Sequence, residues 1–166
     1  MNRQDTTYVL VDVENDSGTD RVVAVDGTLK DAAGKDLGPL AVDEMRVPAG
    51  QIRTFALLFT RVAREGAGAA VRVRRAEAVT YPEPVTIALV EAVRDGDIYA
   101  VTARVKNTLA RHALATVCAT FYDAGGAILA RPFIGPELDP SASRPYRFDG
   151  PKEAVRAAVF VYEVTF

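Results

Sequence analysis

Residues 9–15 read VLVDVEN, and residues 101–107 read VTARVKN. In both stretches valine or alanine occupies every second position, which is the period of a β-strand with one buried face. Each stretch ends on asparagine, which tolerates the left-handed conformation and can bond its own backbone two residues further on. The stretches lie 92 positions apart, so they predict equivalent strands of a repeated structure.

The same offset aligns the residues that follow each stretch. Alternating positions hold Val, Val, Gly and Leu over residues 23–29, and Ala, Val, Ala and Phe over residues 115–121. Two turns come next, Asp31–Gly34 and Asp123–Gly126. In each turn the aspartate is suited to opening a type I turn, and the glycine is suited to the left-handed position that follows. We therefore expect a hairpin at the same place in both copies.

Pro48 and Pro140, also 92 positions apart, mark a further shared turn. Short alternating strands separated by turns, without a long helical period, predict an all-β fold. The repeat makes it two tandem immunoglobulin-like antiparallel β-sandwiches. Two prolines within residues 80–84 forbid a central strand and stiffen a short linker. We therefore assign residues 1–80 to copy one and residues 81–166 to copy two.

Copy two begins with an additional strand. Residues 85–93 are rich in apolar side chains, and residues 94–97 form a turn that leads into the strand starting at Ile98. The counterpart of this strand in copy one would lie before Met1. The sequence therefore predicts a truncated N-terminus, from which a signal or anchor segment has been removed.

The motifs of both copies resemble the bacterial FxLYD-type immunoglobulin-like domains. Copy two carries Asn107-Thr108 at a strand end and Phe121-Tyr122-Asp123-Ala124-Gly125-Gly126 at the hairpin, and copy one keeps Asn15 and the Asp31–Gly34 turn. Gly27 and Ala119 stand where the first phenylalanine of the family motif is usual. The resemblance implies spacer or interaction modules on secreted or membrane-tethered bacterial proteins. It therefore implies an extracytoplasmic location, periplasmic or on the cell surface.

Charge and hydropathy exclude two classes of partner. The formal net charge is −2 and no basic face is concentrated in either half, whereas nucleic-acid binding depends on neutralising phosphates. No apolar run approaches the roughly 18 residues that a membrane span requires. We expect a protein partner, and neither a nucleic acid nor a membrane span in this chain.

Catalysis and cofactor binding are not expected. His112 is the sole histidine and Cys118 the sole cysteine, and neither is predicted to lie beside a nucleophile or base as nucleophilic catalysis requires. Cys118 falls on the opposite strand face from Val117 and aligns with Asp26, so we expect it to point outward. Residues 12–20 are similar to a calcium loop, but Ser17 stands where glycine is needed. The sequence predicts no enzyme, no metal and no cofactor.

Two groups of residues are candidate partner contacts. Arg72, Arg74 and Arg75, together with Arg53, predict a basic strip that either protects a sheet edge from pairing or binds an anion. Phe133 and Ile134 lie in a proline-rich connection, where they either cover the open end of the core or contact a partner.

These observations favour a non-catalytic interaction or spacer module. Such a module could bind by strand addition at an exposed edge, and homodimerisation through sheet edges follows from the same geometry. The alternative hypothesis is a ligand-binding accessory domain of a larger enzyme or assembly, with a small anion or a sugar as ligand.

Overall fold

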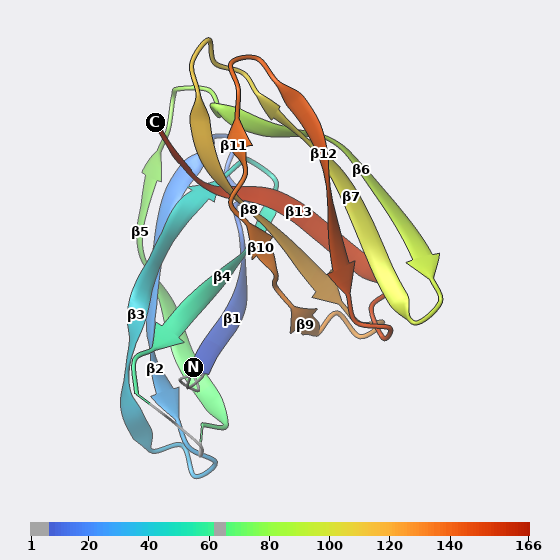
Figure 1. Cartoon of the computed structure of the whole chain (residues 1–166). Helices are drawn as coiled ribbons and strands as arrows, with labels where there is room; N and C mark the ends of the chain where they lie inside the picture. The colour runs from blue at the N-terminus through green and yellow to red at the C-terminus, as the bar shows by residue number, and fades with distance from the viewer. Residues whose placement is uncertain (1–6, 62–65) are drawn as a thin grey trace. The chain divides into compact units, whose positions relative to one another are not determined.

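The computed structural model describes residues 7–61 and 66–166, and in it the chain is all-β with antiparallel sheets (Figure 1). The prediction of an all-β sandwich is confirmed. The chain divides into two compact units, Met1–Thr80 (unit 1) and Tyr81–Phe166 (unit 2). Across the described residues no helix has the length and apolar character needed to cross a membrane.

Unit 1 contains two sheets. The first is two-stranded and pairs β1 with β4, and the second has the order β3-β2-β5. The strands are β1 (Thr7–Glu14), β2 (Arg21–Lys30), β3 (Asp36–Val47), β4 (Ile52–Phe59) and β5 (Gly68–Ala78). β2 pairs with β3 on one side and with β5 on the other, so β5 forms an edge of its sheet.

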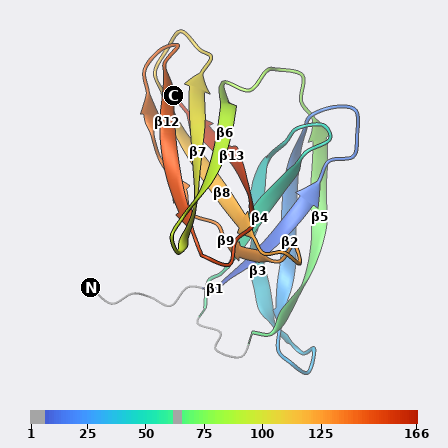
Figure 2. The ribbon, with the colours of Figure 1, turned by 90° about the vertical axis from the view of Figure 1, so that its right-hand side faces the viewer.

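Unit 2 repeats this order and adds a strand. One sheet has the order β12-β7-β6 (Figure 2), and in the other β8 pairs with β13 and with three short strands. The strands are β6 (Val85–Asp95), β7 (Ile98–Asn107), β8 (Ala113–Tyr122), β9 (Ile128–Ala130), β10 (Phe133–Ile134), β11 (Glu137–Leu138), β12 (Ser143–Gly150) and β13 (Arg156–Thr165). The segment expected to be a plain connection between strands therefore forms an interrupted edge strand along β8, because its prolines allow only short stretches of pairing.

The asparagines that end β1 and β7 lie at corresponding places. Asn15 Nδ2 donates to the carbonyls of Thr19 (2.9 Å) and Val47 (2.8 Å), and Asn107 Nδ2 donates to those of Arg111 (2.8 Å) and Asp139 (3.0 Å). In both units Oδ1 accepts the amide two residues on, from Ser17 and from Leu109. The expected local bond is confirmed. The left-handed backbone is not, because Ser141 is the one non-glycine residue with positive φ in the described part of the chain.

The first hairpin turn is the same in both units. Gly34 (φ 80°) and Gly126 (φ 84°) adopt the expected left-handed backbone, and their amides donate to the carbonyls of Asp31 and Asp123. The Pro48 turn differs, because Gln51 bonds back to Pro48 whereas Ala142 bonds back to Asp139. The equivalent of Pro48 is therefore Asp139, at an offset of 91, and the alignment of Pro48 with Pro140 is wrong. Both turns have the same length, and the chain between the first hairpin turn and this one is one residue shorter in unit 2, which the gapless alignment missed.

Asp20 ties the start of β2 to this turn in unit 1. Its carboxylate accepts the Ala49 amide (2.9 Å) and the Arg46 guanidinium (Nε, 3.0 Å). The Ala49 amide first, and then Arg46, hold the pKa of Asp20 below its ordinary value. Because a lowered folded-state pKa stabilises the fold only while the group is ionised, this stabilisation is present above the unfolded-state pKa. It is lost as the pH falls through the folded-state pKa.

We expect Asp20→Asn to lower the free energy of unfolding at pH 7 by about 1 kcal/mol, as for a hydrogen-bonded charged group near the surface. The difference between variant and wild type should shrink steadily below about pH 4. Urea unfolding at pH 7, 4 and 3 measures it. A difference that does not change with pH would contradict the assigned role of Asp20.

The two cores draw on different strands. In unit 2 the core includes Val101, Ala103 and Val105 of β7 and Val161 of β13, together with residues of β8 and β12. In unit 1 the fully buried apolar residues of the described strands lie on β2, β3 and β4, with Val25, Phe55 and Leu57 among them. The apolar residues of β1 and β5, which correspond to β7 and β13, are half-buried or exposed.

Candidate functional site

The feature that separates the two units is the outer edge of β1. In unit 2 the corresponding edge of β7 is paired with β6 along its whole length, from Val85 opposite Asn107 to Asp95 opposite Ile98. In unit 1, β1 pairs with β4 on one side, and no strand among the described residues pairs with its other side. We call this side the open edge of β1.

The residues that point their backbone groups into the open edge follow from the strand's alternation. The Asn15 amide donates to the Gln51 carbonyl (3.0 Å), so Asn15 points its backbone groups toward the β4 side. Because neighbouring residues of a strand point their N–H and C=O groups to opposite sides, the even-numbered residues point away from β4. Those residues are Tyr8, Leu10, Asp12 and Glu14.

The core-facing side chains of β1 are less covered than their counterparts. Val9, Val11 and Val13 are half-buried. The residues 92 positions later are Val101, Ala103 and Val105, which are fully buried. β6 flanks these residues in unit 2, whereas none of the described strands of unit 1 lies at the same place, which accounts for the lower burial of the three valines.

The same contrast holds across the sandwich, on β5. Val73 pairs with Val25 and Val161 pairs with Val117, so Val73 and Val161 occupy the same place on the core-facing side of their sheets. Val73 is 53% exposed and Val161 is 8% exposed. In unit 2, β6 packs against β13 across the sandwich, and no described strand of unit 1 covers β5 in this way. Val71, on the same face as Val73, is also exposed.

We refer to Val9, Val11, Val13, Val71 and Val73 as the valine seam. It lies along the open edge and combines an apolar strip with a row of backbone donors and acceptors. An exposed sheet edge of this kind is a template for pairing with another strand. The valine seam was not predicted from the sequence, because burial depends on which strands face each other and cannot be read from alternation.

The edge strands β4, β5 and β6 carry features that discourage pairing, whereas on the open edge of β1 only the carboxylates of Asp12 and Glu14 do so. On β4 the Ala56 amide, which points away from β1, donates to the buried Asp43 carboxylate (2.8 Å). β5 and β6 each contain a register shift, and β5 also carries three arginines. β1 pairs with β4 over its full length without a register shift and contains no proline, lysine or arginine. Regular, unprotected edges are the ones that accept strands.

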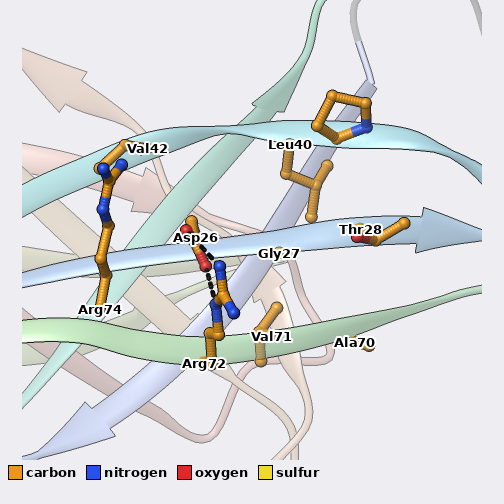
Figure 3. A pocket seen from close by; sticks show the side chains of 10 residues that line it. Asp26, Gly27, Thr28, Leu40, Val42, Ala70, Val71, Arg72 and Arg74 are labelled. Atoms are coloured by element: carbon orange, nitrogen blue, oxygen red, sulfur yellow. Dashed lines mark hydrogen bonds and ion pairs between the residues drawn. The ribbon is translucent and has the colours of Figure 1, made fainter.

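The three predicted arginines of β5 lie close together on the outer face of the β3-β2-β5 sheet. Arg72 Nε donates to Asp26 (2.8 Å), as the dashed lines in Figure 3 mark, and this bond lowers the pKa of Asp26. Arg75 pairs with Glu44 and, at 3.4 Å, with Glu77. Arg74 reaches from β5 toward Val42 in Figure 3. Most of the positive charge of this strip is therefore neutralised by carboxylates of the same unit.

Two shallow depressions lie under these arginines. The larger, of about 570 Å³, is bounded by Arg72, Arg74, Val42 and Gly27, and the smaller by Arg74, Arg75 and Glu44. Arg53, expected in the same strip, is on β4 opposite Val13 and so belongs to the other sheet of unit 1. That part of the prediction is wrong, because Arg53 and the β5 arginines lie on strands of different layers.

Phe133 and Ile134 form β10, opposite Cys118 and Val117 of β8. Phe133 is 68% exposed, whereas Ile134 packs against the core of unit 2. Neighbouring residues of a strand point to opposite faces, which explains why one side chain is free and the other covered. The structure therefore places only Phe133 where a partner could reach it.

His112 and Cys118 do not form a catalytic pair. The His112 side chain is 79% exposed and lies 3.5 Å from a carboxylate oxygen of Asp139, whereas Cys118 is 1% exposed. As expected, Cys118 lies on the face of its sheet that points away from Val117. The expectation that this face is exposed to solvent is wrong. Thr120, Tyr122 and Phe160 on that face are buried as well, so the thiol is not accessible.

In the segment that resembles a calcium loop, each of the side-chain oxygens of Asp12, Asn15 and Asp20 bonds a different partner. Asp12 accepts the Thr54 hydroxyl (2.5 Å), Asn15 bonds the backbone and Asp20 bonds Arg46 and Ala49. No cluster of metal-ligating side chains occurs among residues 7–61 and 66–166. The oxygen atoms of this segment therefore form hydrogen bonds that stabilise unit 1.

Comparison with known proteins gives no family. No protein-family model and no curated protein matches the chain. One solved structure to which the chain is similar is Bacteroides uniformis beta-glucuronidase 2 covalently bound to cyclophellitol-6-carboxylate aziridine. The likeness covers 96% of this chain and a quarter (25%) of that one, at 12% sequence identity and a TM-score of 0.36, which is too low to inform fold or activity. The FxLYD resemblance stays a prediction.

Proposed function

We propose that the chain is a non-catalytic interaction module whose unit 1 takes up an extended strand at the open edge of β1. The observation that carries the proposal is the exposure of Val73, 53% against 8% for its counterpart Val161 beneath β6. An added strand would bond the backbone groups of the open edge and cover the valine seam. This mode of recognition draws affinity from main-chain hydrogen bonds and specificity from alternate side chains.

The strand β6 indicates what such an added strand looks like. It runs antiparallel to β7 and places Val85 and Ile87 on the face shared with Asn107 and Val105, where both pack on the core of unit 2. A strand for unit 1 therefore needs apolar residues at core-facing positions and tolerates polar residues between them. An extracytoplasmic location, which the family resemblance implies, stays part of the proposal.

Binding of a small anion or a sugar has less support. Arg72 and Arg75 already pair with carboxylates, so an anion would compete with Asp26 and Glu44 for them. The depressions beside these arginines are open to solvent, and charged side chains that already have partners form much of their rim. Ligand sites are usually concave and enclose most of the ligand.

A synthetic peptide with the sequence of residues 85–95 tests the proposal. We expect a fluorescently labelled peptide to bind the full chain saturably, measured by fluorescence anisotropy at low protein concentration. A peptide with aspartate in place of Val85 and Ile87, whose side chains pack on the core in unit 2, should bind roughly tenfold more weakly or worse, because two apolar contacts are replaced by buried charge.

The protein variant Leu10→Pro supplies the matched control. Proline at this position removes an amide that points into the open edge and leaves the bonds to β4 in place. Binding should be lost while the far-ultraviolet circular dichroism stays unchanged. Equal binding of both peptides, or full binding by Leu10→Pro, would contradict strand addition at this edge.

A further inference from the structure

We infer that the strand taken up at the open edge is basic on its outward face, with lysine or arginine opposite Glu14 and Asp12. This inference rests on the proposed function, because it gives the chemistry of the partner for the same edge. Its partner is an extended peptide segment in which apolar residues, which cover the valine seam, alternate with basic ones.

The carboxylates of β1 lie where an added strand would meet them. The valines of β1 face the core, and neighbouring residues of a strand point to opposite faces, so Asp12 and Glu14 lie on the outer face of the sheet. Both are exposed, and β4 sets the uncharged Thr54 and Ile52 opposite them. On the other side, an antiparallel strand would place one residue directly opposite each carboxylate, with about 5.5 Å between the Cα atoms.

Unit 2 carries the opposite charge at the same two places. The residues 92 positions after Asp12 and Glu14 are Arg104 and Lys106, and both are exposed on β7. The part of β6 that pairs with this region of β7, residues 85–91, contains one glutamate and no basic residue. The charge of the edge is therefore inverted between the units, so the strand that suits β7 is not the one that suits β1.

The two carboxylates select among strands by their charge. Main-chain hydrogen bonds form with a strand of any sequence, whereas directly opposite side chains stabilise a pair when their charges differ in sign and destabilise it when they agree. An acidic strand is repelled at both positions, and a basic strand gains two ion pairs. Asp12 and Glu14 thus discourage unspecific pairing, as charged residues on an edge do, and admit the strand of matching charge.

Two variants of the residue 85–95 peptide test this selection. Thr86 is the residue that would face Glu14, because it faces Lys106 at the corresponding place in unit 2. We expect the Thr86→Lys peptide to bind the full chain roughly fivefold more tightly than the Thr86→Glu peptide, measured by fluorescence anisotropy at low ionic strength. The difference should largely disappear in about 0.5 M NaCl, because exposed charges are screened by salt.

The protein variant Glu14→Lys identifies the residue responsible. Unit 2 holds lysine at the corresponding place of its own strand, so β1 should tolerate the change. With this variant the order of the two peptides should reverse, the Thr86→Glu peptide becoming the tighter. Glu153→Lys is the matched control, because Glu153 is an exposed residue of unit 2 and its replacement changes the net charge by the same amount. It should leave the preference for the lysine peptide as in the wild type.

Each outcome decides the inference. A preference for the lysine peptide that Glu14→Lys reverses and Glu153→Lys leaves unchanged supports it. Equal binding of the two peptides at low salt, or a preference that Glu14→Lys does not alter, overturns the basic partner and leaves strand addition standing. If neither these peptides nor the unaltered residue 85–95 peptide binds, the proposed function is overturned and the inference with it.

Discussion

A chimera in which residues 85–98 are copied in place of residues 1–6 is expected to raise the free energy of unfolding of unit 1 by about 2–4 kcal/mol. The join is set by the offset of 92, because Ile98 corresponds to position 6 and Tyr99 to Thr7. The copied segment then enters β1 through the same turn that joins β6 to β7.

The expected gain comes from the valine seam. Covering Val73 to the level of Val161 removes nearly half of its surface from water, and Val71 and the three half-buried valines of β1 gain as well. Burying a whole valine side chain contributes about 1.5–3 kcal/mol, so partial burial of five gives the stated range. The ordering entropy of the new strand is offset by its own ladder bonds and side chains, as for β6 in unit 2.

Urea unfolding followed by the NMR signals of unit 1 measures the change, because those signals report on this unit alone. The control is the same chimera with aspartate at the copies of Val85 and Ile87, which pack on the core in unit 2 and should therefore show no gain when charged. The first chimera should also not bind the peptide, because its open edge is occupied. A chimera no more stable than its aspartate control would mean that the seam is not a vacant strand position.

Replacing Asn107 by alanine is expected to destabilise unit 2 by about 3 kcal/mol. The side chain is fully buried, and its Nδ2 donates to the carbonyls of Arg111, Leu138 and Asp139. Alanine would leave the buried Leu138 carbonyl and the partly buried carbonyls of Arg111 and Asp139 without this donor, and such groups are costly when unsatisfied. The loss should appear in the NMR signals of unit 2 during urea unfolding.

Two further variants separate this role from a general effect of mutation. Asn107→Asp keeps the oxygen that accepts the Leu109 amide but cannot donate, so it should destabilise at least as much as alanine. Lys106→Ala, at the exposed neighbouring position, should stay within about 0.5 kcal/mol of wild type. An Asn107→Ala variant as stable as Lys106→Ala would contradict the role assigned to the asparagine.

The sequence was informative where local geometry decides the structure. Alternating valines in residues 9–13 and 101–105 predicted strands, and Asp31 with Gly34 predicted a turn whose bonds the structure bears out. The prediction failed at the later turn, because Pro48 and Pro140 match as letters while the backbone bonds align Pro48 with Asp139. Identity of residue type is weaker evidence than equivalence of hydrogen bonds.

Which side chains are buried depends on contacts between strands far apart in the sequence, and these could not be predicted. Cys118 lies on the expected face of its strand, but that face is buried, and no local pattern distinguishes an outer face in water from one that is covered. Val73 shows the opposite error. It stands in an alternating apolar pattern that is typical of core residues, yet its side chain is exposed. The difference between Val73 and Val161 lies in a strand that faces one and not the other, which is a property of topology.

Hydrogen exchange along β1 is the most direct test of the open edge. In dilute wild-type protein the amides of Tyr8, Leu10, Asp12 and Glu14 should exchange fast, while those of Val9, Val11 and Val13 are protected by β4. In the chimera carrying residues 85–98, the even-numbered amides should slow by roughly a hundredfold or more. Protection of the even-numbered amides already in the dilute wild type, or no slowing in the chimera, would contradict an edge that is open and able to accept a strand.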